Sequence, residues 1–292
     1  MSLKTFVNKS VPTLYMTELS PPVRSVLMTA YIIGLPLYKK EVNLISGEQR
    51  TAAYLKMNPQ GTVPLLQDKD YYLWDSHAIS GYLVHEYGKS DTLYPKDSKK
   101  RAMVDQRLHF DTGILYPEFK NIVYPVIGGE KIITKEKINR VENVYKTFDS
   151  ILANSETKWL VGDTITIADL CNIATLSTLE LFVPPTGKYH HLENWLASCK
   201  KEIPGYDEVN QRGLDKLTFY LKENTSDNSY WKFIEKRFTY AHTEQHRWEK
   251  LRASILQKIP ASSRTTSKAS SSYCWETCST SSPGSLANSL DF

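Results

Sequence analysis

The chain has 292 residues, of which 41% are hydrophobic and 11% aromatic, which is enough for one large globular domain or two smaller ones. Residues 226–292 hold 9 Lys and Arg against 6 Asp and Glu, so most of the net charge of +4 lies there, and the nearly neutral remainder predicts no nucleic-acid partner. No apolar run approaches the roughly 18 residues of a membrane-spanning helix, and the N-terminus lacks an apolar signal core, so a cytoplasmic protein that does not contact a membrane is expected.

Residues 11–90 alternate between strand and helix patterns. Residues 13–16 form a strand-like run, and the apolar spacing from Pro21 onward predicts a helix that stops at Gly34. A second strand within 35–44, a loop and short helix in 47–59, two strands about a tight turn in 62–75 and a helix in 76–88 follow. This order predicts a small α/β domain over residues 11–90.

The remainder divides into a linker, a helical region and a tail. Residues 91–100 are polar and indicate a linker. Helical spacing then dominates residues 101–225, with helices expected near 101–127, 135–154, 166–182 and 191–203, the first of them kinked or interrupted by Pro117 and Pro125. Residues 226–292 are first basic and aromatic and then rich in Ser and Thr, a composition that predicts disorder.

The cysteines give no indication of a disulfide framework or a metal centre. Four are present, at 171, 199, 274 and 278. They are too few and too scattered for a framework. Cys274 and Cys278 have no His or Cys pair at metal spacing elsewhere, so reduced thiols are favoured over half of a zinc site, and no metal is expected.

The stretch "SPPVRSV" places Ser20 at a helix start. Serine is a strong N-cap residue, and Pro21 suits the first helical position because it needs no hydrogen-bond acceptor there. The hydroxyl of Ser20 would then lie beside unpaired N–H groups, a place that favours anions. An ordinary helix cap explains this stretch equally well when it is taken alone.

Two further motifs favour a binding site near Ser20 over an ordinary helix cap. In "NPQGTVPLL", Val63-Pro64 begins a strand, and a cis bond there would expose the N–H and C=O of Val63 to an extended peptide. In "WDSHAI", Asp75 and Ser76 stand at another helix start, where Ser76 could bind a carboxylate and Asp75 an ammonium group. The three motifs together describe a site for a short peptide whose reactive atom lies near Ser20.

In these motifs, and in "DSHAISGYLVHEYG", "LYPKD" and "VGDTITIADL", the chain resembles a cytosolic glutathione transferase of the insect delta and epsilon group, with the epsilon class favoured. The resemblance covers roughly residues 11–225. It implies a thioredoxin-like N-terminal domain, an all-α C-terminal domain and a homodimer. It also implies an enzyme that conjugates glutathione, as co-substrate, to a small apolar electrophile in xenobiotic detoxification.

The resemblance assigns roles to individual residues. Ser20 matches the catalytic serine; Tyr15 is the rival, because other classes use a tyrosine near the first strand. The residues implied in glutathione binding are Gln49, Gln60, Gly61, Thr62, Val63, Pro64, Asp75, Ser76 and His77. The residues implied in the second-substrate pocket are Pro21, Asp111, Tyr116, Phe119, Lys120 and Val123.

Some of these assignments have plainer alternatives. Tyr116, Phe119 and Val123 could be helix core, and Asp111 could form a local cap. Asp169 of "TITIADL" is interpreted as a buried capping residue and not as a catalytic one. Gln49 and Gly61 stand where many relatives have histidine, so weaker glutathione binding is expected, and a histidine at 61 is expected to lower the KM for glutathione.

Three other functions stay open at this point. The chain could be a non-catalytic carrier of glutathione or apolar ligands, or an isomerase or peroxidase of the same family. It could also be an interaction module that recruits a partner through residues 226–292.

Overall fold

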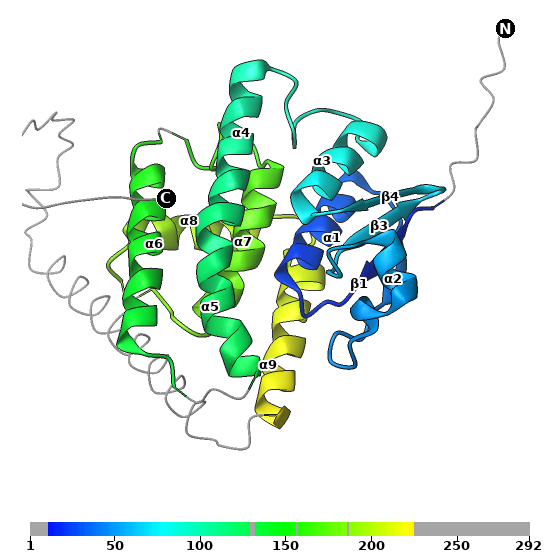
Figure 1. The fold of residues 1–292 in the computed structure, drawn as a ribbon. Coiled ribbons are helices and arrows are strands. Elements are labelled where there is room, and N and C mark those ends of the chain that lie inside the picture. Colours follow the sequence, from blue (N-terminus) through cyan, green and yellow to red (C-terminus); the bar gives the residue numbers. More distant parts are fainter. Residues whose placement is uncertain (1–10, 129–131, 156, 186, 225–292) are drawn as a thin grey trace, which may run out of the picture. The chain divides into compact units, whose positions relative to one another are not determined.

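The computed structural model describes residues 11–128, 132–155, 157–185 and 187–224, all within one compact unit. The N-terminal part contains a mixed four-stranded sheet in the order β2-β1-β3-β4 (Figure 1). Its strands are β1 (Thr13–Met16), β2 (Tyr38–Glu41), β3 (Leu65–Asp68) and β4 (Tyr71–Trp74). β1 pairs parallel with β2 and antiparallel with β3, and β3 pairs antiparallel with β4.

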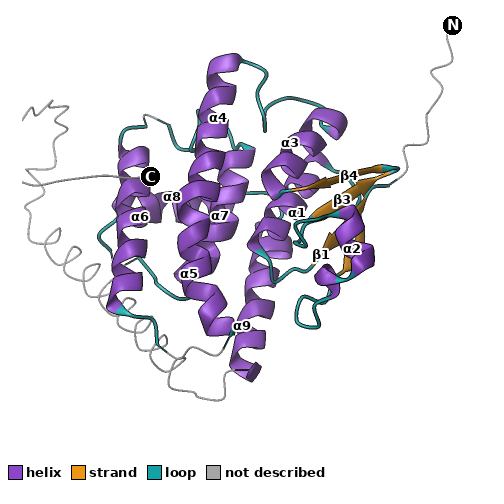
Figure 2. Cartoon of the chain, in the orientation of Figure 1, coloured by secondary structure: helices purple, strands orange, loops and turns teal. Residues whose placement is uncertain are grey.

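Three helices complete this domain, and Figure 2 shows them around the strands. They are α1 (Pro21–Ile33), α2 (Ala52–Met57), which follows a 3₁₀ turn at Glu48–Arg50, and α3 (Ser76–Tyr87). α1 ends as expected at Gly34, whose φ of 68° is left-handed. The α/β domain expected from the sequence is therefore confirmed as a thioredoxin-like arrangement.

The rest of the described chain is helical, as expected. Its α-helices are α4 (Ser98–Phe110), α5 (Tyr116–Ile127), α6 (Lys135–Ala153), α7 (Ile167–Glu180), α8 (His190–Glu202) and α9 (Arg212–Asn224). α4 begins at Ser98, inside the segment that was expected to be a linker. The disorder expected for residues 226–292 lies outside the described residues.

Two π-helical segments, η2 (Asp111–Leu115) and η3 (Tyr206–Gln211), were not predicted. η2 joins α4 to α5 just before Pro117, so the chain widens its turn where a proline ring would crowd the carbonyl four residues earlier. Pro125 lies inside α5. The expected interruption is thus the π-helical segment just before Pro117, and α5 follows it directly.

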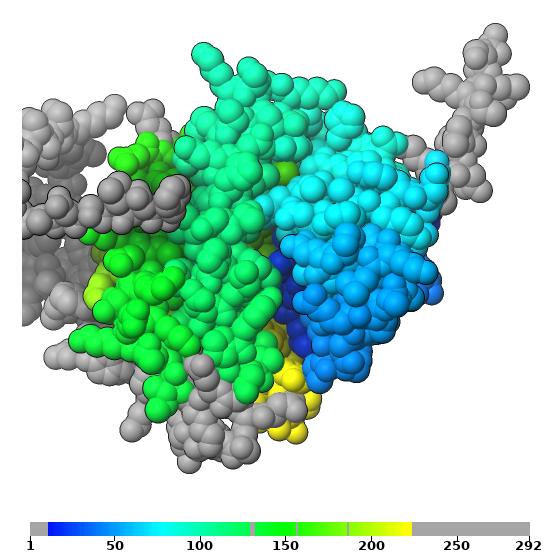
Figure 3. All heavy atoms as spheres, viewed as in Figure 1, coloured from blue at the N-terminus to red at the C-terminus, as the bar shows by residue number. Residues whose placement is uncertain are grey.

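The main hydrophobic core runs without a break from the sheet into the helical domain. Leu14 and Met16 of β1 point into this core, and α1 packs against both α3 and α7. In the space-filling view the α/β domain, blue to cyan, lies directly against the green helices (Figure 3). Residues alternate across a strand, so Tyr15 points to the opposite face, where it joins Val42, Tyr54 and Leu65 in a smaller core.

Asp169 is a structural residue of this core. It is fully buried near the start of α7, where its carboxylate accepts hydrogen bonds from the main-chain N–H groups of Leu160 and Thr166 and from Nε1 of Trp195. Burial raises the pKa of this carboxyl, and these hydrogen bonds oppose the rise. The interpretation of "TITIADL" as a buried capping motif is therefore confirmed.

Candidate functional site

The candidate site lies at one edge of the sheet, and the strand register defines that edge. Leu65, the first residue of β3, pairs with Tyr15 near the end of β1 and with Trp74 at the end of β4. The loop that leads to Ser20, the turn at Val63 and the helix start at Asp75 therefore leave the sheet on the same side. Adjacent strands lie about 4.8 Å apart, so β1 and β4 are separated by about 10 Å, a span that suits a short peptide.

Ser20 is the N-cap residue of α1, with the extended backbone (φ −82°, ψ 121°) expected for a cap before proline. Its N–H donates to the carbonyl oxygen of Thr17 and its own carbonyl accepts from the N–H of Arg24, both at 3.1 Å. The side chain is half-buried, and within the described residues the hydroxyl makes no hydrogen bond to the helix or to any other group. The hydroxyl is thus available to a ligand.

Tyr15, the rival to Ser20, is engaged on the opposite face of the sheet. Its hydroxyl donates to Oε1 of Gln67 at 3.0 Å, and its ring meets that of Tyr54 edge-on, with centroids 6.1 Å apart. The Nζ of Lys40 lies 4.8 Å from the ring centroid. These contacts hold the tyrosine in the smaller core and away from α1.

The Val63–Pro64 peptide bond is cis, immediately before β3. The turn is fixed from α2, because the carbonyl oxygen of Thr62 accepts hydrogen bonds from the hydroxyl of Tyr54 and Nδ2 of Asn58, both at 2.8 Å. Neither the N–H nor the C=O of Val63 is engaged among the described residues. Both main-chain groups of Val63 can therefore pair with an extended ligand.

Gly61 occupies a backbone position that suits glycine. Its φ is +62°, and a Cβ added there would lie 2.9 Å from Nη1 of Arg50 and 3.0 Å from the carbonyl oxygen of Gln49. Nη1 of Arg50 also donates to the carbonyl of Gln60 at 3.3 Å. The side chain of Gln49 donates from Nε2 to the carbonyl of Leu44, while its Oε1 is buried without a partner among the described residues. A histidine at 61 would therefore meet both backbone strain and crowding.

Asp75 and Ser76 form the start of α3. Oδ1 of Asp75 accepts from the N–H groups of His77 and Ala78, each at 3.0 Å, so the aspartate caps the helix. Its other carboxylate oxygen has no partner among the described residues. Asp75 has φ 74° and ψ 121°, a conformation that is rare outside glycine and that tends to occur at ligand sites. Ser76 follows it as the first, buried residue of the helix.

The ring of His77 is directed into the helical domain. Its Nε2 lies 2.9 Å from Oδ2 of Asp111, and its Nδ1 lies 3.0 Å from Oγ1 of Thr112. Burial lowers the pKa of the imidazole, but the neighbouring Cys171 and Asp111 raise it to about 11, so the ring is charged at neutral pH. Both ring nitrogens are thus engaged within the protein, and Asp111 pairs with a distant residue in place of forming a local cap.

The residues predicted for the second-substrate pocket divide into two groups. Phe119 and Val123 are buried in the main core. Tyr116 is half-buried and stacks on Phe119, with centroids 5.1 Å apart, and Nζ of the exposed Lys120 lies 5.7 Å from the Tyr116 ring. Pro21 is buried directly after Ser20. The pattern in α5 therefore combines a core face with a more accessible aromatic edge at Tyr116.

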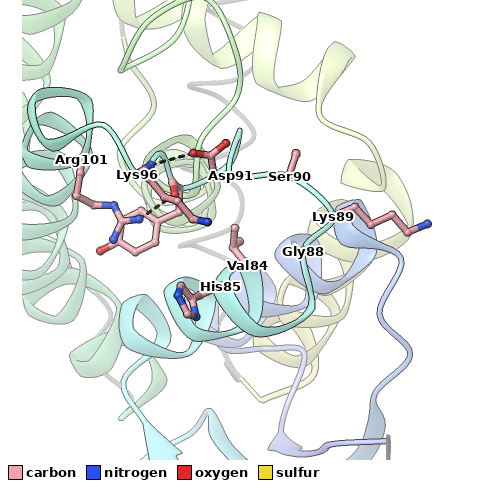
Figure 4. A pocket seen from close by; sticks show the side chains of 9 residues that line it. Val84, His85, Gly88, Lys89, Ser90, Asp91, Lys96 and Arg101 are labelled. Carbon is pink, nitrogen blue, oxygen red and sulfur yellow. Dashed lines mark hydrogen bonds between the residues drawn. The ribbon is translucent and has the colours of Figure 1, made fainter. Parts of the chain in front are cut away.

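A cavity of about 310 Å³ lies elsewhere, at the other end of α3 (Figure 4). Val84 and Gly88 at the end of this helix line it, with Arg101 of α4. Nε and Nη2 of Arg101 donate to the carbonyls of Pro95 and Tyr94, and its guanidinium stacks on the Tyr94 ring. Val84 is eight residues from Ser76, or about 12 Å along the helix, so this cavity is separate from the candidate site.

Two residues next to the site were not predicted. Arg24, in α1, is fully buried, and Glu18, just before Ser20, is 8% exposed. The available signal was a charged residue inside the apolar run "PPVRSVLMTAYII" of α1. Within the described part of the chain, no helix is long and apolar enough to cross a membrane, and no group of three or more His, Cys, Asp or Glu side chains is placed to hold a metal ion.

Comparison with known proteins agrees with this geometry. Residues 14–91 match the family "Glutathione S-transferase, N-terminal domain", and residues 103–201 match "Glutathione S-transferase, C-terminal domain". Glutathione S-transferase 1 of Manduca sexta is 43% identical over 219 residues, which is 71% of this chain and all of the relative.

Solved structures of two insect classes resemble the chain about equally. An epsilon-class glutathione S-transferase from the housefly, Musca domestica, is 39% identical with a TM-score of 0.69, over 74% of this chain and all of that one. A delta-class glutathione transferase from Nilaparvata lugens is 37% identical with a TM-score of 0.68, over 73% and 99%.

The sheet edge, the helical domain and these matches together define a transferase that uses glutathione as its co-substrate. The chain belongs to the glutathione S-transferase family, in its insect group. The comparisons do not separate the delta class from the epsilon class that the sequence favoured.

Proposed function

We propose that Ser20 activates the glutathione thiol and that the resulting thiolate attacks an apolar electrophile. A free thiol has a pKa of about 8.5, so little thiolate is present at neutral pH. The hydroxyl of Ser20, at the positive end of α1, would donate a hydrogen bond to the sulfur and stabilise its charged form. The observation that carries this proposal is the Ser20 hydroxyl, which is unengaged within the described residues at a helix start beside the peptide-sized edge.

The rest of the tripeptide would bind along the same edge. Val63 offers an unpaired N–H and C=O to the middle of glutathione. The free carboxylate oxygen of Asp75 would accept from the α-ammonium of the γ-glutamyl group, and Ser76 would hold its carboxylate. Gln49, Gln60, Gly61, Thr62 and Pro64 would complete the site as its floor and glycyl end. His77 would support it from the first turn of α3, where its main-chain N–H donates to Asp75 and its ring contacts Asp111 of the helical domain.

The electrophile would bind between Pro21 and the edge of α5 at Tyr116 and Lys120, with Phe119, Val123 and Asp111 behind them. With an aryl halide, a carbon–sulfur bond forms, the carbon–halogen bond breaks, and the thiol proton has already passed to water. Apolar, aromatic surroundings suit the small electrophiles of xenobiotic detoxification. The resemblance to cytosolic glutathione transferases further supports a homodimer in the cytoplasm. Light scattering on the purified protein tests the homodimer.

The proposal is tested by steady-state conjugation of glutathione to a chromogenic aryl halide. The full chain is compared with Ser20→Ala and with Ser25→Ala, which removes a hydroxyl of the same helix that donates to the Pro22 carbonyl. We expect activity in the wild type and in Ser25→Ala, and a loss of about 10²-fold or more in kcat/KM for Ser20→Ala. An inactive wild type that still binds glutathione would identify a carrier instead.

A further inference from the structure

Arg24 connects the helical domain to the loop that carries Ser20. It belongs to α1 and is fully buried, yet each of its five N–H groups has an acceptor. Nη1 donates to the carbonyl oxygens of Glu18 at 3.1 Å and Leu19 at 3.0 Å. These are the two residues immediately before Ser20.

The other three donors anchor the guanidinium in the helical domain. Nε donates to Oδ1 of Asn210 in η3 at 2.9 Å, and Nη2 donates to the carbonyl of Ala174 and to Oγ1 of Thr178 in α7. Asn210 is held in turn, because its Nδ2 donates to Oγ of Ser177 at 2.9 Å. One planar side chain thus fixes the loop before Ser20 to elements that lie far along the sequence.

The first turns of α9 hold the same loop from another side. Glu18 accepts from Nη2 of Arg212 at 2.5 Å and from Nζ of Lys216 at 2.6 Å. Gly213 lies between these cations, and a Cβ there would be 2.3 Å from Cδ of Arg24 and 2.6 Å from the carbonyl oxygen of Glu18. α9 can approach this closely only because position 213 carries no side chain.

The character of Arg24 indicates a role beyond stability. Its guanidinium has no carboxylate within ion-pair distance among the described residues, since that of Glu18 is paired with α9. Burying a charge that is satisfied by neutral oxygens is costly, and an apolar side chain of similar size is often as stabilising. Arginine supplies what an apolar residue cannot: a rigid fork that sets the position of two carbonyls.

We propose that Arg24 is a positioning residue for Ser20, and that Gly213 of α9 is part of the same device. The guanidinium holds the carbonyls of Glu18 and Leu19 so that the Ser20 hydroxyl keeps its direction toward the thiol of glutathione. The inference rests on the proposed function of Ser20. It extends the catalytic machinery to the last described helix, whose glycine is 193 residues from Ser20 in sequence.

The test uses two variants of the full chain and one control. Arg24→Lys keeps a single nitrogen donor but removes the planar fork. Gly213→Ala keeps arginine at position 24, but the added Cβ would push against Cδ of Arg24 and the carbonyl oxygen of Glu18 and so displace the guanidinium. Thr178→Val is the control, because it removes one helical anchor and leaves both loop carbonyls held. Folding is checked by circular dichroism and thermal unfolding.

The readout is the apparent thiol pKa from the pH dependence of kcat/KM, with kcat and the KM for glutathione measured separately. We expect Arg24→Lys and Gly213→Ala to raise this pKa by roughly one unit and to lower kcat/KM near neutrality about tenfold, with little change in KM. Thr178→Val is expected to shift it much less.

The decisive comparison is made in the Ser20→Ala background. If Arg24 and Gly213 act through Ser20, Gly213→Ala produces no further shift once the hydroxyl is gone. A folded Gly213→Ala with the wild-type pKa, or a shift of equal size in the Ser20→Ala background, overturns the inference. An inactive wild type instead overturns the proposed function, so the two failures are distinguishable.

Discussion

Nε2 of His77 lies 2.9 Å from Oδ2 of Asp111, which joins the first turn of α3 to the π-helical segment η2. The pair is largely buried, with 14% of the His77 side chain and 7% of the Asp111 side chain exposed. The main-chain N–H of His77 donates to Asp75 in the candidate glutathione site, and η2 leads directly into α5. The His77–Asp111 pair therefore connects the proposed glutathione site at Asp75 to α5, which carries the proposed electrophile pocket.

Removing one partner of this pair is expected to cost more stability than removing both. His77→Gln leaves the Asp111 carboxylate buried without a cation, and Asp111→Asn leaves the imidazolium without an anion, so each should lower the free energy of unfolding by about 3 kcal/mol or more. The double variant should lose less than either single variant, and therefore clearly less than the sum of the two single losses. Urea unfolding of the four proteins measures this coupling, and additive losses would show that the pair contributes nothing as a unit.

The pair should also make stability depend on pH on the alkaline side. The folded-state pKa of His77 is raised to about 11, from an unfolded value of 6.5. A raised folded pKa gives a contribution that is fully present below the unfolded pKa and is lost as pH rises toward the folded one. The stability difference between wild type and His77→Gln should therefore shrink as pH rises from about 6.5 to about 9. A stability difference that stays constant or grows as pH rises would contradict a charged His77–Asp111 pair.

The substitution Gly61→His is expected to harm the protein and not to improve it. The backbone there has φ +62°, and the added Cβ would crowd Gln49 and Arg50. A cost of about 1–3 kcal/mol is expected, with no fall in the KM for glutathione. Gln49→His is the matched comparison, since Gln49 lies in the 3₁₀ turn Glu48–Arg50 and not at a left-handed backbone position, and it should lower that KM. A stable Gly61→His with a lowered KM would show that this turn adapts.

Tyr116 should affect the electrophile and not glutathione. It is the half-buried residue of the aromatic pair with Phe119, so Tyr116→Ala should raise the KM for an apolar electrophile severalfold and leave the KM for glutathione unchanged. Tyr116→Phe keeps the stacking and should resemble the wild type. Phe119→Ala, in the core, should instead lower stability by about 3–5 kcal/mol. If Tyr116→Ala, Tyr116→Phe and Phe119→Ala all kept the wild-type KM for the electrophile, the electrophile pocket would lie elsewhere.

Local rules made much of this fold predictable. The N-cap at Ser20, the strand start after Val63-Pro64 and the capping box at Thr166–Asp169 each follow from residues within a few positions of one another. The same rules bring Val63 and Asp75 together, because the short antiparallel connection between β3 and β4 returns both to one edge. Ser20 joins them through the pairing of β1 with β3, two strands that lie far apart in the sequence.

Contacts between distant segments were beyond those rules. The acceptors of Arg24 lie as far as residue 210, and His77 meets Asp111 across the domain boundary. The π turns at 111–115 and 206–211 keep an almost helical periodicity, so hydrophobic spacing could not reveal them. The sequence alone could not reveal the positive φ at Gly61, which is the reason that a histidine there is no longer expected to lower the KM for glutathione.

The most direct test of the role of Ser20 is the pKa of the glutathione thiol bound to the full chain. It is obtained from the ultraviolet absorbance of the thiolate between about pH 5 and about pH 9, in wild type and Ser20→Ala. We expect a bound thiol pKa at least about one unit below the free value of about 8.5 in the wild type, and a return toward that value in Ser20→Ala. The same pKa in both proteins would contradict the role of Ser20.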